Sequence, residues 1–359
     1  MIAVYGAAGA IGRRIAAALV ERGAAVRLVG RDRLRLVAAA DELGLVPGDV
    51  VAAPIHDRAA LIEALAGCTA VIGAAGPFAR VGPALAAAAV AAEVHYLDVA
   101  IEPGFVRALY EEHESAARRS GRCLVSAVGG FGALGDWAAD WAVAALAAVD
   151  EPVAAIEIAY GFDGAAIAPG MARSLVAALA GPAPRWQRGR WDEVAPTARG
   201  KTIDFGDLGL RRARPFATVE AITVPRRHRV DRVDTYVAPT GAPWLDRALG
   251  AAAPLLRWVP GAAATIDALV DPGRAPPDDA HGLTRFAVVA TAHGPRRTAT
   301  VTASGRDLYA ITAAIAARLA HGLASGALDA IGVVTPAELV GGERALGAIA
   351  DLTIDVALT

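Results

Sequence analysis

The chain has 359 residues, a formal net charge of −2 and a hydrophobic content of 55%. This length is enough for two domains with well-buried cores, and the near-neutral charge gives no support to nucleic acid or an anionic membrane surface as a partner. The two cysteines form no Cys-x-x-Cys pair, so neither a zinc or other metal site nor a disulfide framework is expected.

The apolar segments are interrupted before they reach the length of a membrane span. Residues 131–149 contain Asp136 and Asp140, and residues 248–266 contain Arg257 and two prolines. A transmembrane helix needs roughly 20 consecutive apolar residues. A glycine motif occupies the N-terminus, where a signal peptide would stand. We therefore expect a cytoplasmic protein without a transmembrane segment.

Residues 1–12 predict a strand, a glycine turn and the start of a helix. The apolar run 2–5 leads into the sequence GAAGAIG, and an amphipathic segment follows. In such a turn the first glycine permits the bend, the second lets the backbone approach a pyrophosphate, and the third lets helix and strand pack closely. The helix N-terminus adds N–H groups and a positive dipole end for the anion. The residues predicted to form this dinucleotide site are Gly6, Ala8, Gly9, Ala10, Ile11 and Gly12.

Strands and helices then alternate as far as residue 130. Apolar runs predict strands over residues 25–30, 50–54, 70–75, 95–98 and 122–127. Helices are predicted over residues 34–43, 59–66, 83–92 and 103–120. This α/β alternation is typical of a doubly wound parallel sheet, so residues 1–130 are predicted to form a Rossmann dinucleotide-binding domain.

The pattern changes in the second part of the chain. Strands are predicted over residues 156–162, 186–194, 216–224, 234–238, 284–292 and 297–304, several of them joined by short turns as in an antiparallel sheet. Helices are predicted over residues 169–180, 244–269 and 306–325. We expect an inserted α+β substrate domain over residues 131–305. The C-terminal helices, residues 306–359, are predicted to pack back on the first domain.

The end of the second predicted strand reads Gly30-Arg31-Asp32. At this strand tip an acidic residue binds the ribose 2′-hydroxyl of NAD, whereas an arginine accommodates the 2′-phosphate of NADP. Arg31 occupies the position, and its guanidinium can stack on adenine while it contacts phosphate. NADP(H) is therefore predicted in preference to NAD(H). Asp32 lies one residue later and can also reach a ribose, so the use of both cofactors stays open.

Further cofactor contacts are expected where the other parallel strands end, because ligands bind at the carboxyl ends of such strands. Asp57 follows the third strand and is predicted near the adenine. The turn Ala75-Gly76-Pro77-Phe78 follows the fourth strand and is predicted under the nicotinamide ribose. Asp98 and Val99 follow the fifth strand and are predicted on the nicotinamide side.

The residue inventory excludes two enzyme classes that share such an opening loop. Short-chain dehydrogenases need a Tyr-x-x-x-Lys pair, but Thr197 stands four residues before Lys201, the only lysine. Semialdehyde reductases need a nucleophilic cysteine near a helix N-terminus, whereas Cys68 and Cys123 lie in apolar, strand-like contexts. The remaining chemistry is direct hydride transfer, for which the protein supplies a proton or polarises the acceptor.

Several side chains are candidates for that proton donor. Tyr160, on the first strand of the second domain, is the preferred pocket acid, and Asp98 is the preferred residue beside the cofactor. Tyr96, Glu102 and Asp136 lie near strand ends and remain alternatives, as does Asp163 on the same strand as Tyr160. A lone histidine is more often structural, but four histidines are also candidates: His95, His281, His293 and His321.

The substrate pocket is predicted from aromatic residues. Phe131, Trp137 and Tyr160 are expected to surround a small hydrophobic molecule. The apolar segment 244–269 is interpreted as a lid over that molecule, as a contact in a homodimer, or as a helix pair of the core.

A family resemblance is carried by Gly6–Gly12, by Gly30-Arg31 and by the segments 74–99, 125–143, 306–322 and 332–339. These residues resemble the saccharopine dehydrogenase-like oxidoreductases, including the trans-acting enoyl reductases of lipid and polyketide pathways. The resemblance implies an NADP(H)-dependent enzyme that reduces the C=C (enoyl) bond of a small or lipid-like substrate. Imine or carbonyl reduction of the saccharopine type is the first alternative.

A third hypothesis belongs to another class. The family's Gly-Phe-Asp-Ser-x-Pro-Ser-Asp motif is replaced here by the sequence from Gly130 to Asp136, and most of its polar residues are lost. A protein that binds the dinucleotide as a sensor, without catalysis, therefore remains possible.

Overall fold

The computed structural model describes residues 1–359 except 47–48, 165–167, 181–182, 194–199, 239–283 and 351–353. The apolar segment 244–269 lies outside the described residues. The described chain forms two compact units. Unit 1 comprises Met1–Ala100, Phe105–Gly130 and Tyr309–Val334. Unit 2 comprises Ile101–Gly104, Phe131–Leu308 and Thr335–Thr359.

Within the described residues, unit 1 contains a seven-stranded parallel sheet in the order β15-β6-β5-β4-β1-β2-β3. Its strands are β1 (Ile2–Tyr5), β2 (Val26–Gly30), β3 (Val50–Ala52), β4 (Ala70–Gly73), β5 (His95–Asp98), β6 (Cys123–Val125) and β15 (Gly332–Val334). Strands β1, β4 and β6 consist of apolar residues that are buried at every position, as expected for strands with both faces covered. The predicted doubly wound sheet is confirmed.

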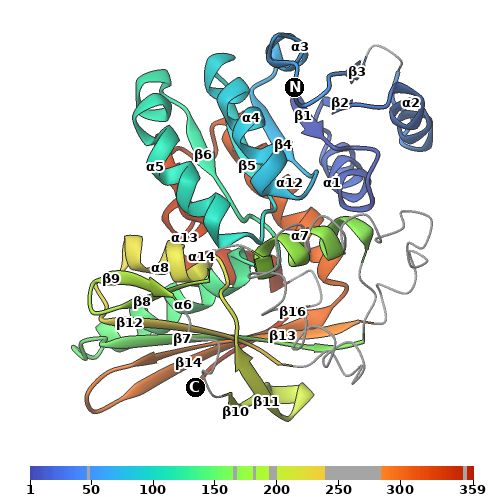
Figure 1. Cartoon of the computed structure of the whole chain (residues 1–359). Coiled ribbons are helices and arrows are strands. Elements are labelled where there is room, and N and C mark those ends of the chain that lie inside the picture. The colour runs from blue at the N-terminus through green and yellow to red at the C-terminus, as the bar shows by residue number, and fades with distance from the viewer. Residues whose placement is uncertain (47–48, 165–167, 181–182, 194–199, 239–283, 351–353) are drawn as a thin grey trace. The chain divides into compact units, whose positions relative to one another are not determined.

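The helices of unit 1 are α1 (Ala10–Glu21), α2 (Arg33–Glu42), α3 (Arg58–Leu65), α4 (Phe78–Ala91), α5 (Pro103–Ser120) and nearly all of α12 (Leu308–Ser325). Helices α1 to α4 pack against neighbouring strands of the sheet (Figure 1). Helix α4 begins five residues before the predicted start at Pro83, because Phe78 and Gly82 are already buried in its first turns.

Helix α12 is apolar enough to be tested as a membrane span. Its 18 residues have a mean hydropathy of 1.2, and half of them are buried. The buried positions include Ile311, Ile315, Leu319 and Leu323, which recur at helical spacing. In the described part of the chain no other helix passes the same length and hydropathy test. The buried stripe is that of a core helix.

Unit 2 is built on a mixed sheet whose described strands number nine, with the main order β10-β11-β12-β7-β13-β14-β16. The strands are β7 (Ala155–Asp163), β8 (Pro184–Gln187), β9 (Arg190–Glu193), β10 (Lys201–Asp204), β11 (Leu210–Pro215), β12 (Arg232–Val237), β13 (Arg285–His293), β14 (Thr298–Arg306) and β16 (Ile354–Leu358). The helices are α6 (Ala133–Ala147), α7 (Pro169–Ala180), α8 (Glu220–Arg227), α13 (Pro336–Leu339) and α14 (Gly342–Ile349), with a 3-10 turn η2 (Gly206–Leu208).

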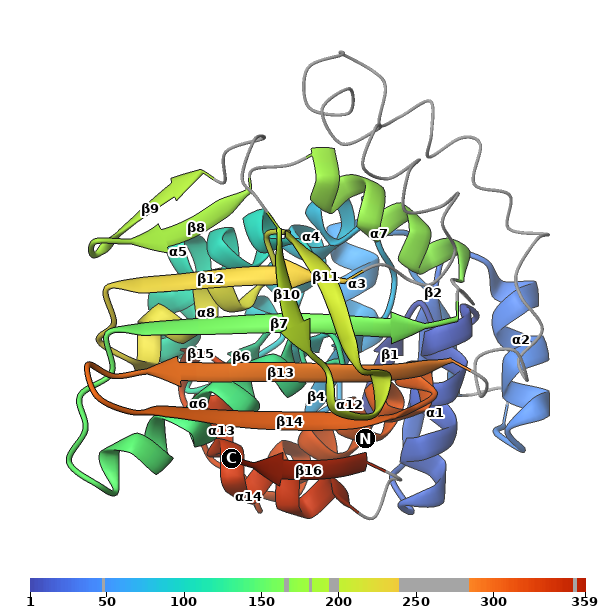
Figure 2. The ribbon, with the colours of Figure 1, turned by 90° about the horizontal axis from the view of Figure 1, so that it is seen from below.

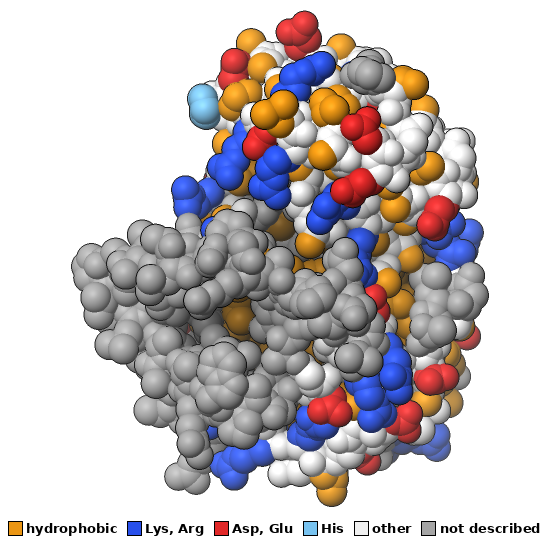
Figure 3. Space-filling view, turned by 90° about the vertical axis from the view of Figure 1, so that its right-hand side faces the viewer, with side chains coloured by type: hydrophobic (Ala, Val, Ile, Leu, Met, Phe, Trp, Pro, Cys, Tyr) orange, Lys and Arg blue, Asp and Glu red, His pale blue; other side chains and the backbone are white. Residues whose placement is uncertain are grey.

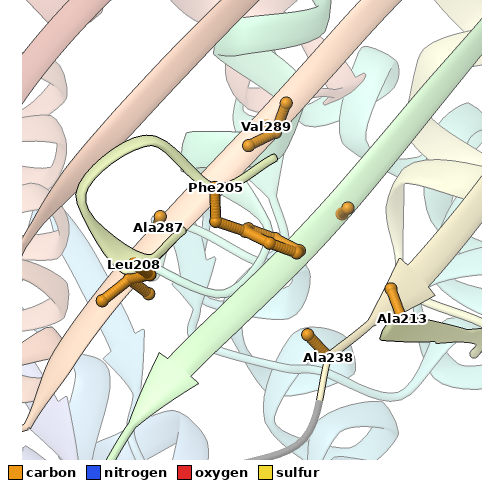
Figure 4. Close-up of a cluster of buried hydrophobic side chains, with 7 residues drawn as sticks. Phe205, Leu208, Ala213, Ala238, Ala287 and Val289 are labelled. Carbon is orange, nitrogen blue, oxygen red and sulfur yellow. The ribbon is translucent and has the colours of Figure 1, made fainter. Parts of the chain in front are cut away.

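The two faces of this sheet are covered differently. Helix α6 packs on β13 and β14, while η2 packs on the strands from the other side. Figure 2 shows β12, β7, β13, β14 and β16 side by side, with the β10–β11 hairpin crossing the near face and α6 and α8 behind. On the near face Phe205 and Leu208 lie in a cluster of small side chains that includes Ala159 (Figure 4). Gly161 has no room for a side chain there, because a Cβ would lie 2.7 Å from the ring of Phe205. Successive residues of a strand point to opposite faces, so Tyr160 lies on the α6 side.

Several predicted elements of unit 2 were wrong or incomplete. Residues 216–224 were predicted as a strand, but Glu220–Arg227 form α8. The Thr and Val residues of this segment favour strands locally, yet buried contacts with α6 decide the outcome. Residues 186–194 form a hairpin, β8 and β9, instead of one strand. The strands β10, β11 and β16 were not predicted.

The C-terminal segment divides between the units, in contrast to the predicted block 306–359. Residues Tyr309–Val334 lie in unit 1, where β15 extends the sheet beside β6. Residues Thr335–Thr359 lie in unit 2, where β16 pairs with β14.

Candidate functional site

The turn between β1 and α1 has the backbone geometry that a bound diphosphate requires. Gly6 adopts a φ of 85°, in the left-handed region that side chains disfavour, and its N–H donates to Val29 O at 2.8 Å. Gly9 is the N-cap residue of α1, and its N–H donates to Gly6 O at 2.9 Å. In the described structure no side chain caps α1, and its first turn holds no acidic residue. The first N–H groups of the helix therefore point to a site suited to an anion.

Close backbone approaches explain the glycines. A Cβ on Gly12 would lie 2.2 Å from Gly6 O, so α1 could not start so near the turn. A Cβ on Gly6 would lie 2.8 Å from the Cβ of Ala75, just after β4. A Cβ on Gly9 would lie 3.2 Å from Gly6 O. This compact cradle of backbone, at the carboxyl end of β1 and against the end of β4, fits the diphosphate of a dinucleotide.

The charged residues after β2 differ in their bonding. Arg31 is exposed, and its charge opposes the burial that raises the pKa of Tyr5. Asp32 is the N-cap residue of α2, and its Oδ1 accepts a hydrogen bond from Arg35 N at 3.2 Å. Arg35 reaches back to the glycine turn, where its Nη2 donates to Ala8 O at 3.4 Å. Asp32 is thus engaged in capping, while Arg31 and Arg35 bring two guanidinium groups to this end of the turn.

The turn after β4 adjoins the glycine turn. Ala75 lies against Gly6, and the cis peptide bond between Gly76 and Pro77 follows it. Phe78 is only 4% exposed and packs on Phe105, with ring centroids 6.0 Å apart. Its side chain therefore supports the turn from inside unit 1 instead of lining a ligand site, which corrects its predicted role.

Asp57 has a structural task of its own. It is exposed, and its Oδ1 accepts a hydrogen bond from Ala60 N at 3.0 Å as the N-cap of α3. Such a cap stabilises a helix by about 1 kcal/mol. The contact with adenine that the sequence predicts for Asp57 stays a prediction.

Asp98 is fully buried at the end of β5. Its Oδ1 accepts hydrogen bonds from Ala100 N at 2.9 Å, Ser126 Oγ at 2.7 Å and Ala127 N at 3.0 Å. Its backbone oxygen accepts from Val128 N at 2.8 Å. Burial raises the pKa of Asp98, and these hydrogen bonds oppose the rise. The carboxyl group fixes the turn after β6 and is out of reach of a ligand, so Asp98 is a positioning residue and its predicted catalytic role is corrected.

Helix α12 also forms a hydrogen bond with the turn after β6. Gly130 N donates to Thr312 Oγ1 at 3.0 Å. A Cβ on Gly129 would lie 3.1 Å from Thr312 Cγ2 and 3.6 Å from the Cβ of Val99. Val99 and Thr312 are half-buried. The residues that follow β5 and β6 therefore meet α12 at the carboxyl edge of the parallel sheet.

In unit 2 the predicted pocket residues Phe131 and Tyr160 lie together. Their rings are stacked with centroids 4.2 Å apart, and the rings of Phe131 and Phe162 are 5.8 Å apart. Phe131 and Phe162 are half-buried, but Tyr160 is 1% exposed. Trp137 is buried in α6, and its Nε1 has no hydrogen-bond partner among the described residues. The two phenylalanines are the accessible part of this aromatic cluster.

The Tyr160 hydroxyl is bonded inside unit 2. It accepts a hydrogen bond from Gly132 N at 3.0 Å and donates to Glu220 Oε1, while the Thr218 hydroxyl donates to Glu220 Oε2. A Cβ on Gly135 would lie 2.5 Å from the hydroxyl oxygen, so no space remains beside it. Burial raises the pKa of Glu220 to about 7 and, together with Glu220, raises the pKa of Tyr160 well above its usual value. Tyr160 is thus a buried network member, which corrects its predicted role as an accessible acid.

Asp136, an alternative donor, is engaged as well. Its Oδ1 accepts from Thr223 Oγ1 at 2.6 Å, and its Oδ2 accepts from Ala337 N at 2.8 Å, at the start of α13. Burial raises the pKa of Asp136 to about 6. The carboxyl group joins α6 to α8 and α13.

Sequence reasoning missed several residues of these networks, among them Arg35, Glu220 and Thr312. Arg35 carried a usable signal, because it lies in the first turn of the helix that follows Arg31 and Asp32. Glu220 was hidden by the wrong strand prediction. Thr312 gave no local signal, since it meets Gly130 across 182 residues of sequence.

One face of the molecule can be judged for its charge distribution. On the face drawn in Figure 3, acidic and basic side chains are interspersed and the hydrophobic ones form small separate patches. Among the described residues no group of three or more His, Cys, Asp or Glu side chains could hold a metal ion.

A glycine turn at the N-terminus of α1, in a sheet with the order β3-β2-β1-β4-β5-β6, defines a dinucleotide-binding protein of the Rossmann type. Residues 2–125 match the family model described as the saccharopine dehydrogenase NADP binding domain. This part of the chain is therefore similar to the NADP-binding domain of the saccharopine dehydrogenases.

Solved structures extend the likeness in fold to the whole chain. Saccharopine dehydrogenase (L-Glu forming) from Saccharomyces cerevisiae is 14% identical with a TM-score of 0.66, over 100% of this chain and 99% of that one. Homospermidine synthase from Legionella pneumophila, in complex with NAD, is 11% identical with a TM-score of 0.68, over 100% of this chain and 90% of that one. No curated protein matches the chain. The fold is thus that of saccharopine dehydrogenase.

Proposed function

We propose that this protein is an NADP(H)-dependent oxidoreductase acting on a small hydrophobic substrate. The observation that carries the proposal is the glycine cradle at Gly6, with Arg31 and Arg35 on its β2 side. When bound, the cofactor supplies the hydride chemistry. The turn binds the diphosphate, the arginines bind the 2′-phosphate, and the half-buried rings of Phe131 and Phe162 offer apolar surface to a substrate.

The proposed preference for NADP(H) rests on the hydrogen bonds made by the charged residues that follow β2. Two guanidinium groups match a phosphate dianion, whereas the Asp32 carboxylate, which could select NAD(H), is used to cap α2. The likeness to a homospermidine synthase solved with NAD supports NAD(H) as the alternative cofactor.

The variant Arg31→Asp tests this preference. It removes a positive charge and places a carboxylate where the 2′-phosphate would bind, so NADPH binding should weaken by at least tenfold while NADH binding changes little. Fluorescence titration of both cofactors measures the two dissociation constants. Unchanged NADPH affinity would contradict the proposal.

The bond reduced is proposed to be a C=C bond of an enoyl substrate. The uncharged aromatic cluster of Phe131 and Phe162, and the resemblance of segments 74–99 and 306–339 to the trans-acting enoyl reductases, support this reaction. Reduction of an imine or carbonyl is the second candidate, and the fold shared with saccharopine dehydrogenase supports it.

An NADPH absorbance assay with enone, imine and ketone panels separates these candidates. Consumption with enones alone supports enoyl reduction, and consumption with imines or ketones supports the saccharopine type. Tight NADPH binding without consumption on any panel would favour the sensor hypothesis.

A further inference from the structure

We propose that Glu220, acting through Tyr160, is a positioning residue for the substrate, and that the aromatic rings it holds in place select substrates with a flat conjugated group. This inference rests on the proposed function and deepens it, because it names a substrate shape and a residue that sequence reasoning missed. The residues involved all lie in unit 2, outside the family-model match to residues 2–125.

The side chain of Tyr160 is fixed at both of its ends. Its backbone lies within β7, between the neighbouring strands β12 and β13. Its hydroxyl accepts a hydrogen bond from Gly132 N at 3.0 Å and donates one to Glu220 Oε1. A tyrosine hydroxyl has a single proton, so donation to Glu220 leaves the oxygen lone pairs for the backbone N–H. Glu220 therefore sets the direction in which this hydroxyl bonds.

Glu220 itself has little freedom to move. It is fully buried, and its second carboxyl oxygen accepts a hydrogen bond from the Thr218 hydroxyl. The space beside the pair exists only because residue 135 is a glycine, since a Cβ there would lie 2.5 Å from the Tyr160 hydroxyl oxygen. A buried network with both carboxyl oxygens bonded holds its members in one geometry. The tyrosine ring is thus locked.

The locked tyrosine ring sets the orientation of two phenylalanine rings. Phe131 directly precedes Gly132 and stacks on Tyr160, with 10° between the ring planes. Phe162 follows Tyr160 by two residues, on the same face of β7. Its ring plane is 8° from that of Tyr160 and 5° from that of Phe131. Phe131 and Phe162 are half-buried, so the accessible parts of both rings share one orientation.

A shared ring orientation favours one shape of ligand. Aromatic rings bind other π systems preferentially in offset stacked or edge-to-face arrangements. Rings with parallel planes can both contact the face of one flat molecule, whereas a puckered ring loses part of that contact. An enone conjugated with an aryl group is flat over its whole length, and its C=C bond is the one reduced in the proposed reaction. We therefore expect a planar, conjugated substrate.

Two enones that differ only in the flatness of one ring test the shape preference. Benzylideneacetone carries a planar phenyl group on its enone, and its cyclohexyl analogue carries a puckered ring with the same number of carbons. Calorimetric titration in the presence of NADP⁺ gives both dissociation constants without turnover. We expect the phenyl compound to bind about tenfold more tightly, although the cyclohexyl ring is the more hydrophobic. Phe162→Leu keeps an apolar side chain without the ring, and it should reduce the ratio to about twofold or less.

Variants of Glu220 test the positioning role. Glu220→Ala removes the acceptor of the Tyr160 hydroxyl, so the dissociation constant and the KM for benzylideneacetone should rise about fivefold, with kcat and NADPH binding unchanged. Tyr160→Phe keeps the ring and removes only the hydroxyl, and it should show the same loss. Glu220→Gln still offers an acceptor oxygen and should stay within about twofold of the unmodified protein.

Tyr236→Phe is the matched control for these variants. Tyr236 belongs to β12 of the same sheet, but it pairs with Ala159 and packs against the cluster on the opposite face. Loss of its hydroxyl should leave the binding of both enones unchanged, since this ring does not contact Phe131 or Phe162.

The outcomes separate the inference from the proposed function. Equal binding of the two enones, or binding of neither, would overturn the shape preference. An unchanged dissociation constant in Glu220→Ala, or an equal loss in Glu220→Gln, would overturn the positioning role. If the protein prefers benzylideneacetone but oxidises no NADPH with it, the proposed reaction fails while the shape preference stands. Preferential binding that is lost in Glu220→Ala and kept in Glu220→Gln supports the inference.

Discussion

Arg33 and Arg35 lie in the first turn of α2, and their side chains donate hydrogen bonds to different segments of the chain. Arg33 Nη1 donates to Val50 O at 3.2 Å, at the start of β3, while Arg35 Nη2 donates to Ala8 O in the glycine turn. Both side chains are exposed. The two residues have the same charge and similar exposure. Variants of the two therefore distinguish the effect of an arginine's position on cofactor binding from the effect of net charge.

The variant Arg35→Gln should weaken NADPH binding by roughly tenfold, because a charge-assisted bond to phosphate contributes about 1.5–3 kcal/mol before solvent screening. NADH binding should stay within about twofold, since NADH has no 2′-phosphate. Arg33→Gln, the matched control, should change neither affinity by more than about twofold. Equal losses in the two variants would show that only the overall charge matters.

At the level of single residues, prediction succeeded where a role depends on local backbone. Gly6 and Gly12 were predicted correctly as the bend and the close-packing position, because three glycines at fixed spacing reflect a local geometry. The predicted roles of Asp98 and Tyr160 were wrong because their partners lie 28 and 60 residues away in the chain. No local pattern shows that Asp98 Oδ1 and the Tyr160 hydroxyl are already engaged in hydrogen bonds with distant parts of the chain.

Helix α6 organises unit 2 through two acidic residues one turn apart. Asp136 binds α8 and the first turn of α13. Asp140 accepts from Gly342 N at 2.7 Å, at the start of α14, and pairs with Arg227 of α8. Carboxylates at the N-termini of α13 and α14 bind free N–H groups and complement the helix dipoles. One face of α6 thus secures the C-terminal helices.

The variant Asp140→Ala should lower the free energy of unfolding of unit 2 by about 2–3 kcal/mol, since it removes a helix cap and leaves Arg227 without its carboxylate. The tryptophans of the described residues, Trp137, Trp141, Trp186 and Trp191, lie in unit 2, so their emission follows its unfolding in urea. Asp192→Ala, which removes an exposed pair with Arg190, is the control and should cost less than about 0.5 kcal/mol. A loss no larger than in the control would exclude this role for Asp140.

At the level of elements, the parallel sheet was predictable and the second sheet was only partly so. Strands covered on both faces are continuous apolar runs, and the first six of unit 1 were predicted almost at their observed bounds. In unit 2, β10 and β11 have exposed or half-buried residues at most positions, so they lack that signal. Strand β15 has three residues, too few for any periodicity.

Over the whole molecule, buried carboxyl groups with a raised pKa make the folded state less stable as the pH rises. Glu220 has a pKa of about 7 in the folded protein against an ordinary value of 4.5, and the pKa of Asp136 is likewise raised to about 6. A raised folded pKa means that the folded state binds more protons than the unfolded state. The resulting stabilisation is complete below about 4.5 for Glu220 and is lost as the pH rises through 7.

Glu220→Gln tests this linkage. The unmodified protein should lose roughly 3 kcal/mol of unfolding free energy between pH 4.5 and pH 8 through Glu220, at 1.36 kcal/mol per pKa unit. The amide still accepts the bond from Tyr160 but does not titrate, so the variant should show a smaller fall over the same range. Urea unfolding at pH 4.5 and pH 8, followed by tryptophan emission, measures the difference. An identical fall in both proteins would contradict the raised pKa of Glu220.

Glu157 changes the free energy of unfolding at lower pH than Glu220 does, and its stabilisation increases with pH instead of decreasing. Its hydrogen bond to His293, together with Lys201, lowers the pKa of Glu157 to about 2. The stabilisation from this group is present above about 4.5 and is lost as the pH falls toward 2. Burial also lowers the pKa of His95 and of His113, which opposes the effect of Glu220 in part of the same range. The comparison of the unmodified protein with Glu220→Gln therefore isolates the contribution of Glu220.

The sharing of the C-terminal segment between the units limits how the nucleotide-binding unit can be isolated or exchanged. A fragment ending near residue 130 would contain the glycine turn but neither α12 nor β15. Strand β6, which is buried at every position and pairs with β15, would become an open sheet edge that can pair with other chains. A transplantable cofactor module from this protein therefore has to include residues 309–334, joined to the first 130 by a designed linker.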